Sequence, residues 1–319
     1  MGRRRRLRGN GPSAKRFVAM ARKDGAAAPV ERIHVLGPAG TFSDRAASAY
    51  CRRMFGEGTP PEVVHTRTIE EALANAAGDP ASVAIVPIEN SETGTVIPTQ
   101  EQLRTAPVTI ELELSIPVRY SLISHAAAAD VRQVFCHPLA HGQCSRFLRE
   151  NLPEAEVVFA SSNAQAGVEL ARLGPGSAAA AIVPSEYAAE GSYRVVAANV
   201  QNSAFNTTRF VVVRARSAAA EPDFSRQKSS LVILPRHDRP GLLADLLSAF
   251  ARRAINITRI ESRPSRERPW NYVFFVDIQN NDAVADATRE VGTEVQQLVI
   301  LGTYDSLVVE DAVPPGGAA

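Results

Sequence analysis

The residues from 206 to 213 constrain the fold of this chain more than any other stretch. They read Asn206-Thr207-Thr208-Arg209-Phe210 and continue as Val211-Val212-Val213. A run of β-branched residues is typical of a buried strand. The polar and cationic residues before the run therefore lie at one end of such a strand, where α/β proteins commonly place an active site. We expect Thr208 to take part in chemistry there.

Two other predicted strands end with a proline. Residues 83–86 stop at Pro87, where a polar segment follows, and residues 179–183 stop at Pro184. Proline ends a strand because it has no backbone N–H to donate. Helical segments alternate with the strands, which indicates an α/β fold. We predict a two-lobed, periplasmic-binding-protein-like α/β domain over residues 30–214, with an interlobe cleft and a second lobe at about 115–188.

The chain after residue 214 has a different organisation. Residues 215–227 contain three consecutive alanines and Pro222 and indicate a linker. Predicted elements in residues 228–310 follow the order βαββαβ, the last strand in two short pieces at 299–301 and 307–309. This is the ferredoxin-like order. Residues 1–29 and 311–319 are predicted to be tails.

The positive charge of the chain is concentrated at its start. Residues 1–29 contain nine Lys or Arg and one acidic residue, and the remainder contains 26 basic and 33 acidic residues. A mildly acidic body argues against a nucleic-acid partner, since nucleic-acid-binding proteins carry their cations on the folded domain. The basic tail lacks the apolar segment of a secretory signal, and no stretch is long enough to span a membrane. We expect a disordered tail, with a transit peptide or a start at Met20 as alternatives.

The cysteines indicate a reducing compartment. Cys51, Cys136 and Cys144 are odd in number and lack Cys-x-x-Cys spacing, which argues against a disulfide framework and against structural zinc. We therefore expect a cytoplasmic protein without a bound metal.

Two loops carry residues suited to binding an anion. Residues 37–43 (Gly-Pro-Ala-Gly-Thr-Phe-Ser) join a predicted strand to a helix, an arrangement that aims backbone N–H groups at an anion. A plain strand–helix turn is an equal alternative. Residues 88–96 form a polar cluster at a strand exit, which is either a helix cap with turn residues or a binding loop.

With these segments in this order, the chain resembles bacterial prephenate dehydratases that carry a C-terminal ACT regulatory domain. Six segments, spread over nearly the whole chain after the basic tail, carry the resemblance. They are Gly37-Pro38-Ala39-Gly40-Thr41-Phe42-Ser43, Val86-Pro87-Ile88-Glu89-Asn90-Ser91 with Gly94, Thr208-Arg209-Phe210, Gly241-Leu242-Leu243, Glu261-Ser262-Arg263-Pro264 and Trp270-Asn271-Tyr272-Val273-Phe274-Phe275-Val276-Asp277. Any one of them is weak evidence, but six in the right order are specific.

The resemblance implies a reaction in which prephenate loses water and carbon dioxide to give phenylpyruvate. The leaving hydroxyl needs a proton donor, and decarboxylation needs a carboxylate held where its charge can flow into the ring. Because the product is aromatic, positioning and one acid are enough. No metal or organic cofactor is implied, and no usual cofactor motif is present.

The resemblance also implies roles for individual residues. Thr208 donates to the leaving group, and Arg209 binds the dicarboxylate or else forms a structural ion pair. Asn90 binds a carboxylate or the ring hydroxyl. Glu89 is unfavourable beside a dianion unless it is protonated or turned away to position other groups. Gln143 and Cys136 complete the expected catalytic set, and the expected substrate-binding residues are Gly40, Thr41, Ser91, Thr207 and Phe210.

The chain departs from the family pattern at three positions. Cys136 stands where the family has an active-site serine, and it makes weaker hydrogen bonds than a hydroxyl. His141 replaces an apolar residue, and Asn202 replaces an aspartate. These departures keep a sister reaction open, the non-aromatising decarboxylation of prephenate, although the intact Thr208-Arg209-Phe210 argues against it.

The resemblance implies regulation by phenylalanine at the C-terminal domain. Gly241 before a helix lets backbone amides approach an amino-acid carboxylate, and Arg263 either touches the ligand or holds Glu261. We expect a homodimer or homotetramer. The effector-site residues that the family implies are Gly241, Leu242, Leu243, Glu261, Ser262, Arg263 and Pro264. An arogenate dehydratase and a catalytically inactive amino-acid sensor remain alternatives.

Overall fold

The structure is a computed structural model that describes residues 28–56, 58–190, 193–218, 220–265 and 271–310. Nearly all of the predicted basic tail, the predicted tail at 311–319 and Trp270 lie outside the described residues. Within the described ranges, no helix is long and apolar enough to cross a membrane.

The first lobe is built on a mixed sheet in which the strand order is β5-β11-β3-β1-β2. β1 pairs in parallel with β2 and β3, whereas β11 runs antiparallel to both β3 and β5. The short β4 pairs with the end of β3. These elements are β1 (Arg32–Leu36), α2 (Phe42–Phe55), β2 (Glu62–Thr66), α3 (Ile69–Gly78), β3 (Ser82–Asn90), β4 (Gly94–Thr95), α4 (Ile97–Thr105), β5 (Val108–Pro117) and β11 (Thr207–Ala215).

The second lobe has its own five-stranded sheet with the order β10-β6-β9-β7-β8. It extends past residue 188, where we expected this lobe to end, because β10 pairs with β6. The elements are β6 (Tyr120–Ser124), the 3-10 turn η1 (Ala128–Asp130), β7 (Gln133–Cys136), α5 (Pro138–Gln143), α6 (Ser145–Asn151), β8 (Glu156–Phe159), α7 (Asn163–Leu173), β9 (Ala179–Pro184), α8 (Ser185–Glu190) and β10 (Arg194–Ala198).

Two chain segments connect the lobes, and they run side by side. One joins β5 to β6 and the other joins β10 to β11. The N–H of Val118 on the first donates to the carbonyl of Asn206 on the second, at 2.8 Å. The predicted buried strand, β11, therefore begins at the connection between the lobes. A motion of one lobe against the other would move its first residues.

The C-terminal domain has the predicted βαββαβ order, with the strands arranged β13-β14-β12-β15. Both helices pack on one face of this sheet, in a cluster that includes Leu246, Phe250 and Val291. The elements are β12 (Lys228–Pro235), α9 (Leu242–Ala251), β13 (Ile257–Pro264), β14 (Tyr272–Gln279), α10 (Val284–Glu294) and β15 (Val295–Val308).

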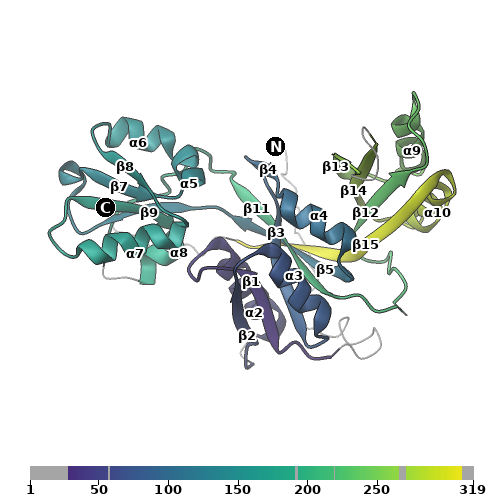
Figure 1. The fold of residues 1–319 in the computed structure, drawn as a ribbon, viewed down its shortest axis with the longest axis horizontal. Helices are drawn as coiled ribbons and strands as arrows, with labels where there is room; N and C mark the ends of the chain where they lie inside the picture. Colours follow the sequence, from purple (N-terminus) through teal and green to yellow (C-terminus); the bar gives the residue numbers. More distant parts are fainter. Residues whose placement is uncertain (1–27, 57, 191–192, 219, 266–270, 311–319) are drawn as a thin grey trace, which may run out of the picture.

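The last strand joins the two domains. We predicted two short pieces here, but β15 is one strand of 14 residues. Its first part pairs with β12, and residues 305–308 pair in parallel with β5 of the first lobe. Gly302 allows this crossing, since a Cβ at this position would lie 2.2 Å from the carbonyl oxygen of Ile110. The C-terminal sheet thus continues into the first sheet, and Figure 1 shows β15 running from one to the other.

Candidate active site

β11 presents its side chains to the two faces of the first sheet in turn. Phe210 belongs to the apolar cluster that includes residues of α2, whereas Val211 belongs to the cluster shared with α3, α4 and the C-terminal sheet. Successive side chains of a strand point to opposite faces. Thr208 therefore lies on the α2 face, and Arg209 lies on the face toward the C-terminal domain.

Asn90 holds the hydroxyl of Thr208. The two residues are register partners, and Nδ2 of Asn90 donates to Oγ1 of Thr208 at 3.0 Å and to Oδ1 of Asn206 at 2.8 Å. Oδ1 of Asn90 accepts from the N–H groups of Glu92 and Thr93, both at 3.0 Å, so the orientation of the amide is determined. A hydroxyl that accepts one hydrogen bond still has its own proton to donate.

Asn206 has an unused donor beside this pair. Its side chain is fully buried, and its Nδ2 has no hydrogen-bond partner in the part of the chain that the structure describes. An unsatisfied buried donor costs roughly 1–3 kcal/mol. A ligand oxygen bound at this end of β11 would remove that cost.

A β-bulge in β3 separates Glu89 from Asn90. Arg209 lies opposite Glu89, but the next residue of β11 lies opposite Pro87, so Ile88 is an extra residue in β3. A bulge changes the direction of the side chains that follow it. Ile88 joins the cluster on the side of the C-terminal domain, and Glu89 contacts Arg209 on that side. Asn90 is turned to the opposite face.

Arg209 makes ion pairs with three carboxylates from three strands. Its Nε donates to Oε2 of Glu89 at 2.7 Å, its Nη1 to Oε2 of Glu113 at 3.0 Å, and its Nη2 to Oδ2 of Asp277 at 3.4 Å. Burial acts to lower the pKa of Arg209, but Glu113, Asp277 and Glu89 outweigh it and raise that pKa. The guanidinium is therefore a permanent cation at the boundary between the domains.

The C-terminal domain supplies further charged residues next to Arg209 and its carboxylate partners. Nζ of Lys228 donates to both carboxylate oxygens of Glu113, at 2.9 and 2.8 Å. Arg259 lies 3.6 Å from Glu89. Burial raises the pKa of Glu113, yet Lys228 and Arg209 bring that pKa below its usual value. We call the set the junction cluster: Glu89, Glu113, Arg209, Lys228, Arg259 and Asp277.

The backbone amides of the glycine-rich loop already bind an anion, the carboxylate of Asp44 on α2. Asp44 lies in the first turn of α2, three residues after the N-cap residue Thr41. Its carboxylate accepts from the N–H of Gly40 and from the N–H of Thr41, the latter at 3.3 Å, and it lies 2.6 Å from Nε2 of His65. The two amides that we expected to bind a substrate carboxylate are thus occupied by a carboxylate of the chain itself.

The same loop and α2 contact the second lobe. Gly40 has φ +80°, and a Cβ there would lie 2.9 Å from Cδ2 of Tyr187, which is on α8. The lobes are therefore in contact beside the glycine-rich loop, and the size of residue 40 limits their approach. The three contacts are Gly40 with Tyr187, Phe42 with Tyr120 (ring centroids 5.5 Å apart) and Arg45 with Glu186 (2.9 Å).

Cys136 is buried at the end of β7. Its side chain packs in the apolar cluster of the second lobe, with Ala140 and Cys144. Burial raises the pKa of the Cys136 thiol to about 11, so the thiol stays protonated at neutral pH. Cys136 fills apolar space here and does not present a thiolate.

Asn202 fastens the segment between β10 and β11 to the helices of the second lobe. Its Oδ1 accepts from the N–H of Arg146 at 3.1 Å, and its Nδ2 donates to the carbonyl of Gly142 at 3.0 Å. The N–H of Asn202 donates to the carbonyl of Gln143 at 2.6 Å. An amide is sufficient for these contacts, so Asn202 has a structural role. Gln143 lies on α5 of the second lobe and is largely buried.

Ser91 and Thr207 hold the start of β11. The N–H of Thr207 donates to Oγ of Ser91 at 3.0 Å, and the N–H of Ser91 donates to the carbonyl of Thr207 at 2.9 Å. The Thr207 hydroxyl donates to the carbonyl of Phe205 at 3.2 Å. Phe210 is 2% exposed and lies in the core.

Sequence reasoning missed several residues of this region. Asn206 lies inside the polar stretch that precedes the valine run, so its position could have identified it. Tyr187 follows a strand that ends at a proline, which is a weaker signal. Arg119 donates to the carbonyl of Asn206 at 3.4 Å, and Asp277 is 68 residues from Arg209 in the sequence. No local pattern indicates either of these contacts.

Comparison with known proteins places this site in a family. A model of the prephenate dehydratase family matches residues 33–218, and a model of the ACT domain matches residues 232–293. Prephenate dehydratase of Mycolicibacterium vanbaalenii is 34% identical over 297 residues, which are 89% of this chain and 94% of the relative. The chain belongs to the prephenate dehydratase family. The resemblance seen in the sequence is confirmed.

Two further relatives agree with this assignment. Prephenate dehydratase of Corynebacterium glutamicum is 33% identical over 289 residues, covering 88% of this chain and 90% of the relative. The crystal structure of prephenate dehydratase from Arthrobacter aurescens in complex with L-Phe superposes with a TM-score of 0.73 at 29% identity. That match covers 86% of this chain and 90% of the relative. The C-terminal domain is an ACT domain, as predicted.

The predicted effector residues of β13 alternate between two faces of the ACT sheet. Glu261 is paired with Phe275, which packs toward the catalytic domain, and Ser262 is paired with Phe274, which packs toward the helices. Thr95 of β4 donates to Glu261 at 3.2 Å. Arg263 lies 3.6 Å from Glu101 of α4. Glu261 and Arg263 therefore contact the catalytic domain, whereas Ser262 and Pro264 lie on the helix side.

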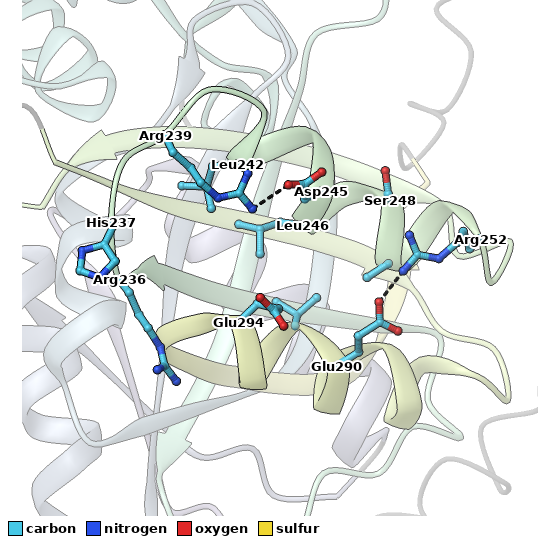
Figure 2. Close-up of a pocket in the computed structure, with 12 residues that line it drawn as sticks. Arg236, His237, Arg239, Leu242, Asp245, Leu246, Ser248, Arg252, Glu290 and Glu294 are labelled. Carbon is cyan, nitrogen blue, oxygen red and sulfur yellow. Dashed lines mark hydrogen bonds and ion pairs between the residues drawn. The ribbon is translucent and has the colours of Figure 1, made fainter.

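The ACT domain also contains a cavity of about 590 Å³ between α9 and α10. Leu242, Leu246 and Val291 are among its apolar residues, and charged residues surround them. Figure 2 shows the ion pair of Arg239 with Asp245 at the end where α9 begins, and the pair of Arg252 with Glu290 farther along the two helices. Of the predicted effector residues, Leu242 lines this cavity.

Proposed function

We propose that this chain converts prephenate to phenylpyruvate, with loss of water and carbon dioxide. The observation that carries the proposal is the hydrogen bond from Asn90 to Thr208 at 3.0 Å. Because the Thr208 oxygen accepts from a fixed amide, its proton is directed to another acceptor. The ring hydroxyl of prephenate is such an acceptor, and it is the group that leaves.

In the reaction, the carbon–oxygen bond of the ring hydroxyl breaks as Thr208 donates to that oxygen. The bond between the ring and its carboxylate breaks at the same ring, and the two electrons enter the ring and make it aromatic. The leaving hydroxyl takes up one proton, from Thr208, and departs as water. Solvent then returns a proton to Thr208. Asn90 orients the donor, and the unused amide of Asn206 binds a substrate oxygen.

The other predicted site residues take different roles in this proposal. Glu89 and Arg209 position the ends of β3 and β11 from the ACT side and do not touch the substrate. Ser91 and Thr207 hold the start of β11, and Phe210 packs the core. Thr41 remains a substrate-binding residue, Gln143 remains in the catalytic set, and Gly40 provides space for Tyr187. Cys136 contributes apolar packing.

A dianionic substrate needs a positive charge, and Arg209 faces away from Thr208. We assign that charge to Arg119. It lies at the connection between the lobes and donates to the carbonyl of Asn206. It is half-buried, which strengthens an ion pair with a bound carboxylate relative to one in water.

We also propose that phenylalanine regulates the enzyme by binding to the ACT domain, at the loop end of α9. The cavity there is within the usual size range of small-molecule sites, roughly 300–1,000 Å³. It combines apolar side chains for a ring with cations and carboxylates for an amino acid's charged groups. The relative from Arthrobacter aurescens, solved with L-Phe, supports this assignment.

The same domain is the proposed contact between subunits. β13 is an edge strand of the ACT sheet and carries Ile260, which is 42% exposed. Tyr272 on β14, which pairs with Pro264 farther along β13, is equally exposed. Exposed edges with apolar side chains favour pairing with another chain. Two copies joined here would form a homodimer, and two dimers a homotetramer.

The test is a turnover assay in which the product is identified. We expect purified protein to convert prephenate to phenylpyruvate. A non-aromatised keto acid would show a decarboxylase, and absence of turnover together with phenylalanine binding would show an amino-acid sensor. Arogenate is assayed in parallel, and slower turnover of arogenate is the expected result. Calorimetry with phenylalanine tests the regulatory part, which an absence of binding heat would contradict.

A further inference from the structure

Asp277 is an ACT-domain residue whose carboxylate is held toward the catalytic domain. It lies on β14 and is 3% exposed. Its Oδ1 accepts from the Ser230 hydroxyl at 2.6 Å, and its Oδ2 lies 3.4 Å from Nη2 of Arg209. The hydroxyls of Ser230 and Tyr304 are themselves 2.6 Å apart. Two ACT strands thus orient one carboxylate at a residue of β11.

The partner of Asp277 is the residue next to Thr208. Three carboxylates fix the guanidinium of Arg209, and its side chain is only 17% exposed. A planar guanidinium held at three donor atoms has little freedom to rotate. Because Arg209 and Thr208 are consecutive in one strand, fixing one side chain restricts the backbone that carries the other.

The charges of the junction cluster balance only when the ACT domain is in place. Glu89, Glu113 and Arg209 come from the catalytic domain and carry a net negative charge. Lys228, Arg259 and Asp277 come from the ACT domain and carry a net positive charge. The six residues together are neutral, so the end of β11 depends on the ACT sheet for its electrostatic partners.

We propose that Asp277 is a positioning residue for the dehydration reaction, acting through Arg209 on the Thr208 hydroxyl. This inference rests on the proposed function. It makes the ACT sheet part of the catalytic apparatus as well as the binding site of an effector. Asp277 does not touch the substrate, so its loss lowers the rate of the chemical step and leaves substrate binding nearly unchanged.

The test is a double-mutant cycle with Asp277→Asn and Arg209→Lys. We expect Asp277→Asn to lower kcat about tenfold, within the range of coupling between distant sites, with KM changed by less than about twofold. In the Arg209→Lys background, the fold-decrease in kcat caused by Asp277→Asn should be at least about three times smaller than in wild type. The reason is that the effects of residues that act through one another are not additive. Equal effects in both backgrounds would overturn the proposal.

Two controls keep the result interpretable. Asp286→Asn removes the exposed ion pair with Arg289 on α10, and kcat should stay at the wild-type value. If Asp277→Asn fails to fold in a urea titration, Ser230→Ala replaces it, since this change removes only the hydroxyl that orients Asp277. We then expect kcat to fall about threefold in wild type and less in the Arg209→Lys background.

The outcomes separate this inference from the proposed function. A wild-type protein that does not form phenylpyruvate overturns both. A wild-type protein that forms phenylpyruvate, together with a folded Asp277→Asn variant of unchanged kcat, overturns only the role of Asp277. A variant with raised KM and unchanged kcat would also contradict it, because that pattern indicates substrate binding.

Discussion

At the scale of single residues, the site depends on the amide of Asn90. Its Nδ2 reaches both Thr208 and Asn206, and its Oδ1 is fixed by two backbone N–H groups. Asparagine is the residue that can do this, because it has donors on one side of the amide and an acceptor on the other.

We expect Asn90→Asp to lower kcat about 100-fold, as general-acid contributions are typically 10²–10⁴-fold. The aspartate keeps the size of the side chain but replaces the donor with an oxygen, which repels the oxygens of Thr208 and Asn206. Steady-state kinetics with prephenate measure the change. Unchanged kcat in Asn90→Asp would show that this amide does not orient Thr208.

At this scale, the sequence was least informative about the face of the sheet to which each side chain points. Thr208 and Arg209 belong to one motif, and both were expected in the active site. The structure places them on opposite faces, because side chains alternate along β11. Glu89 could not be placed either, since the bulge at Ile88 turns it away from Asn90. Pro87 was interpreted as the end of the strand, whereas a proline inside a strand is also compatible with a bulge.

At the scale of elements, the contact between the glycine-rich loop and α8 sets how closely the lobes approach. Gly40 meets Tyr187 with no room for a Cβ. The lobes are joined by two segments between their sheets, a geometry that permits hinge motion. A larger residue at position 40 should hold the lobes apart.

Gly40→Ala should therefore lower kcat/KM by more than its loss of stability explains. The positive φ alone costs roughly 1–2 kcal/mol for any residue other than glycine. Gly174→Ala is the control, because Gly174 also has a positive φ (+70°) and a Cβ added there would meet nothing within 4 Å. Urea titrations should show a loss of stability for both variants, and kinetics should show reduced activity only for Gly40→Ala. Equal activities would contradict a role in lobe approach.

The order of the elements could be predicted because strand ends, prolines and helix caps are local signals. Pro184 marked the end of β9, and βαββαβ was visible in residues 228–310. The prediction that the first-lobe strand stops at Pro87 was wrong, because β3 continues through Pro87 to Asn90. The crossing of β15 onto β5 was not visible. It depends on the contact of Gly302 with Ile110, which are close only in the folded chain.

At the scale of the whole molecule, the junction cluster joins the catalytic and ACT domains through buried charges. Removing one partner of a buried ion pair is costly, because it leaves the other charges uncompensated. Glu113 has a lowered pKa, since Lys228 and Arg209 outweigh the effect of burial. A carboxylate with a lowered folded-state pKa contributes stability above its unfolded pKa, and that contribution is lost as the pH falls.

We expect Glu113→Gln to lower the free energy of unfolding by about 3 kcal/mol at pH 7. The difference from wild type should shrink by up to about 1 kcal/mol at pH 4, where the unfolded state begins to protonate Glu113. Urea titrations at both pH values measure this. A difference that stays constant between pH 7 and pH 4 would show that the charge of Glu113 is not responsible.

The central claim is that the Thr208 hydroxyl, held by Asn90, is the donor in the dehydration step. The most direct measurement compares kcat and KM of wild type, Thr208→Ser and Thr208→Val with prephenate. Valine keeps the branched shape of threonine and removes the hydroxyl. We expect Thr208→Val to lower kcat at least about 100-fold with little change in KM, and Thr208→Ser to keep most of the activity. A folded Thr208→Val variant with the kcat of wild type would contradict the claim.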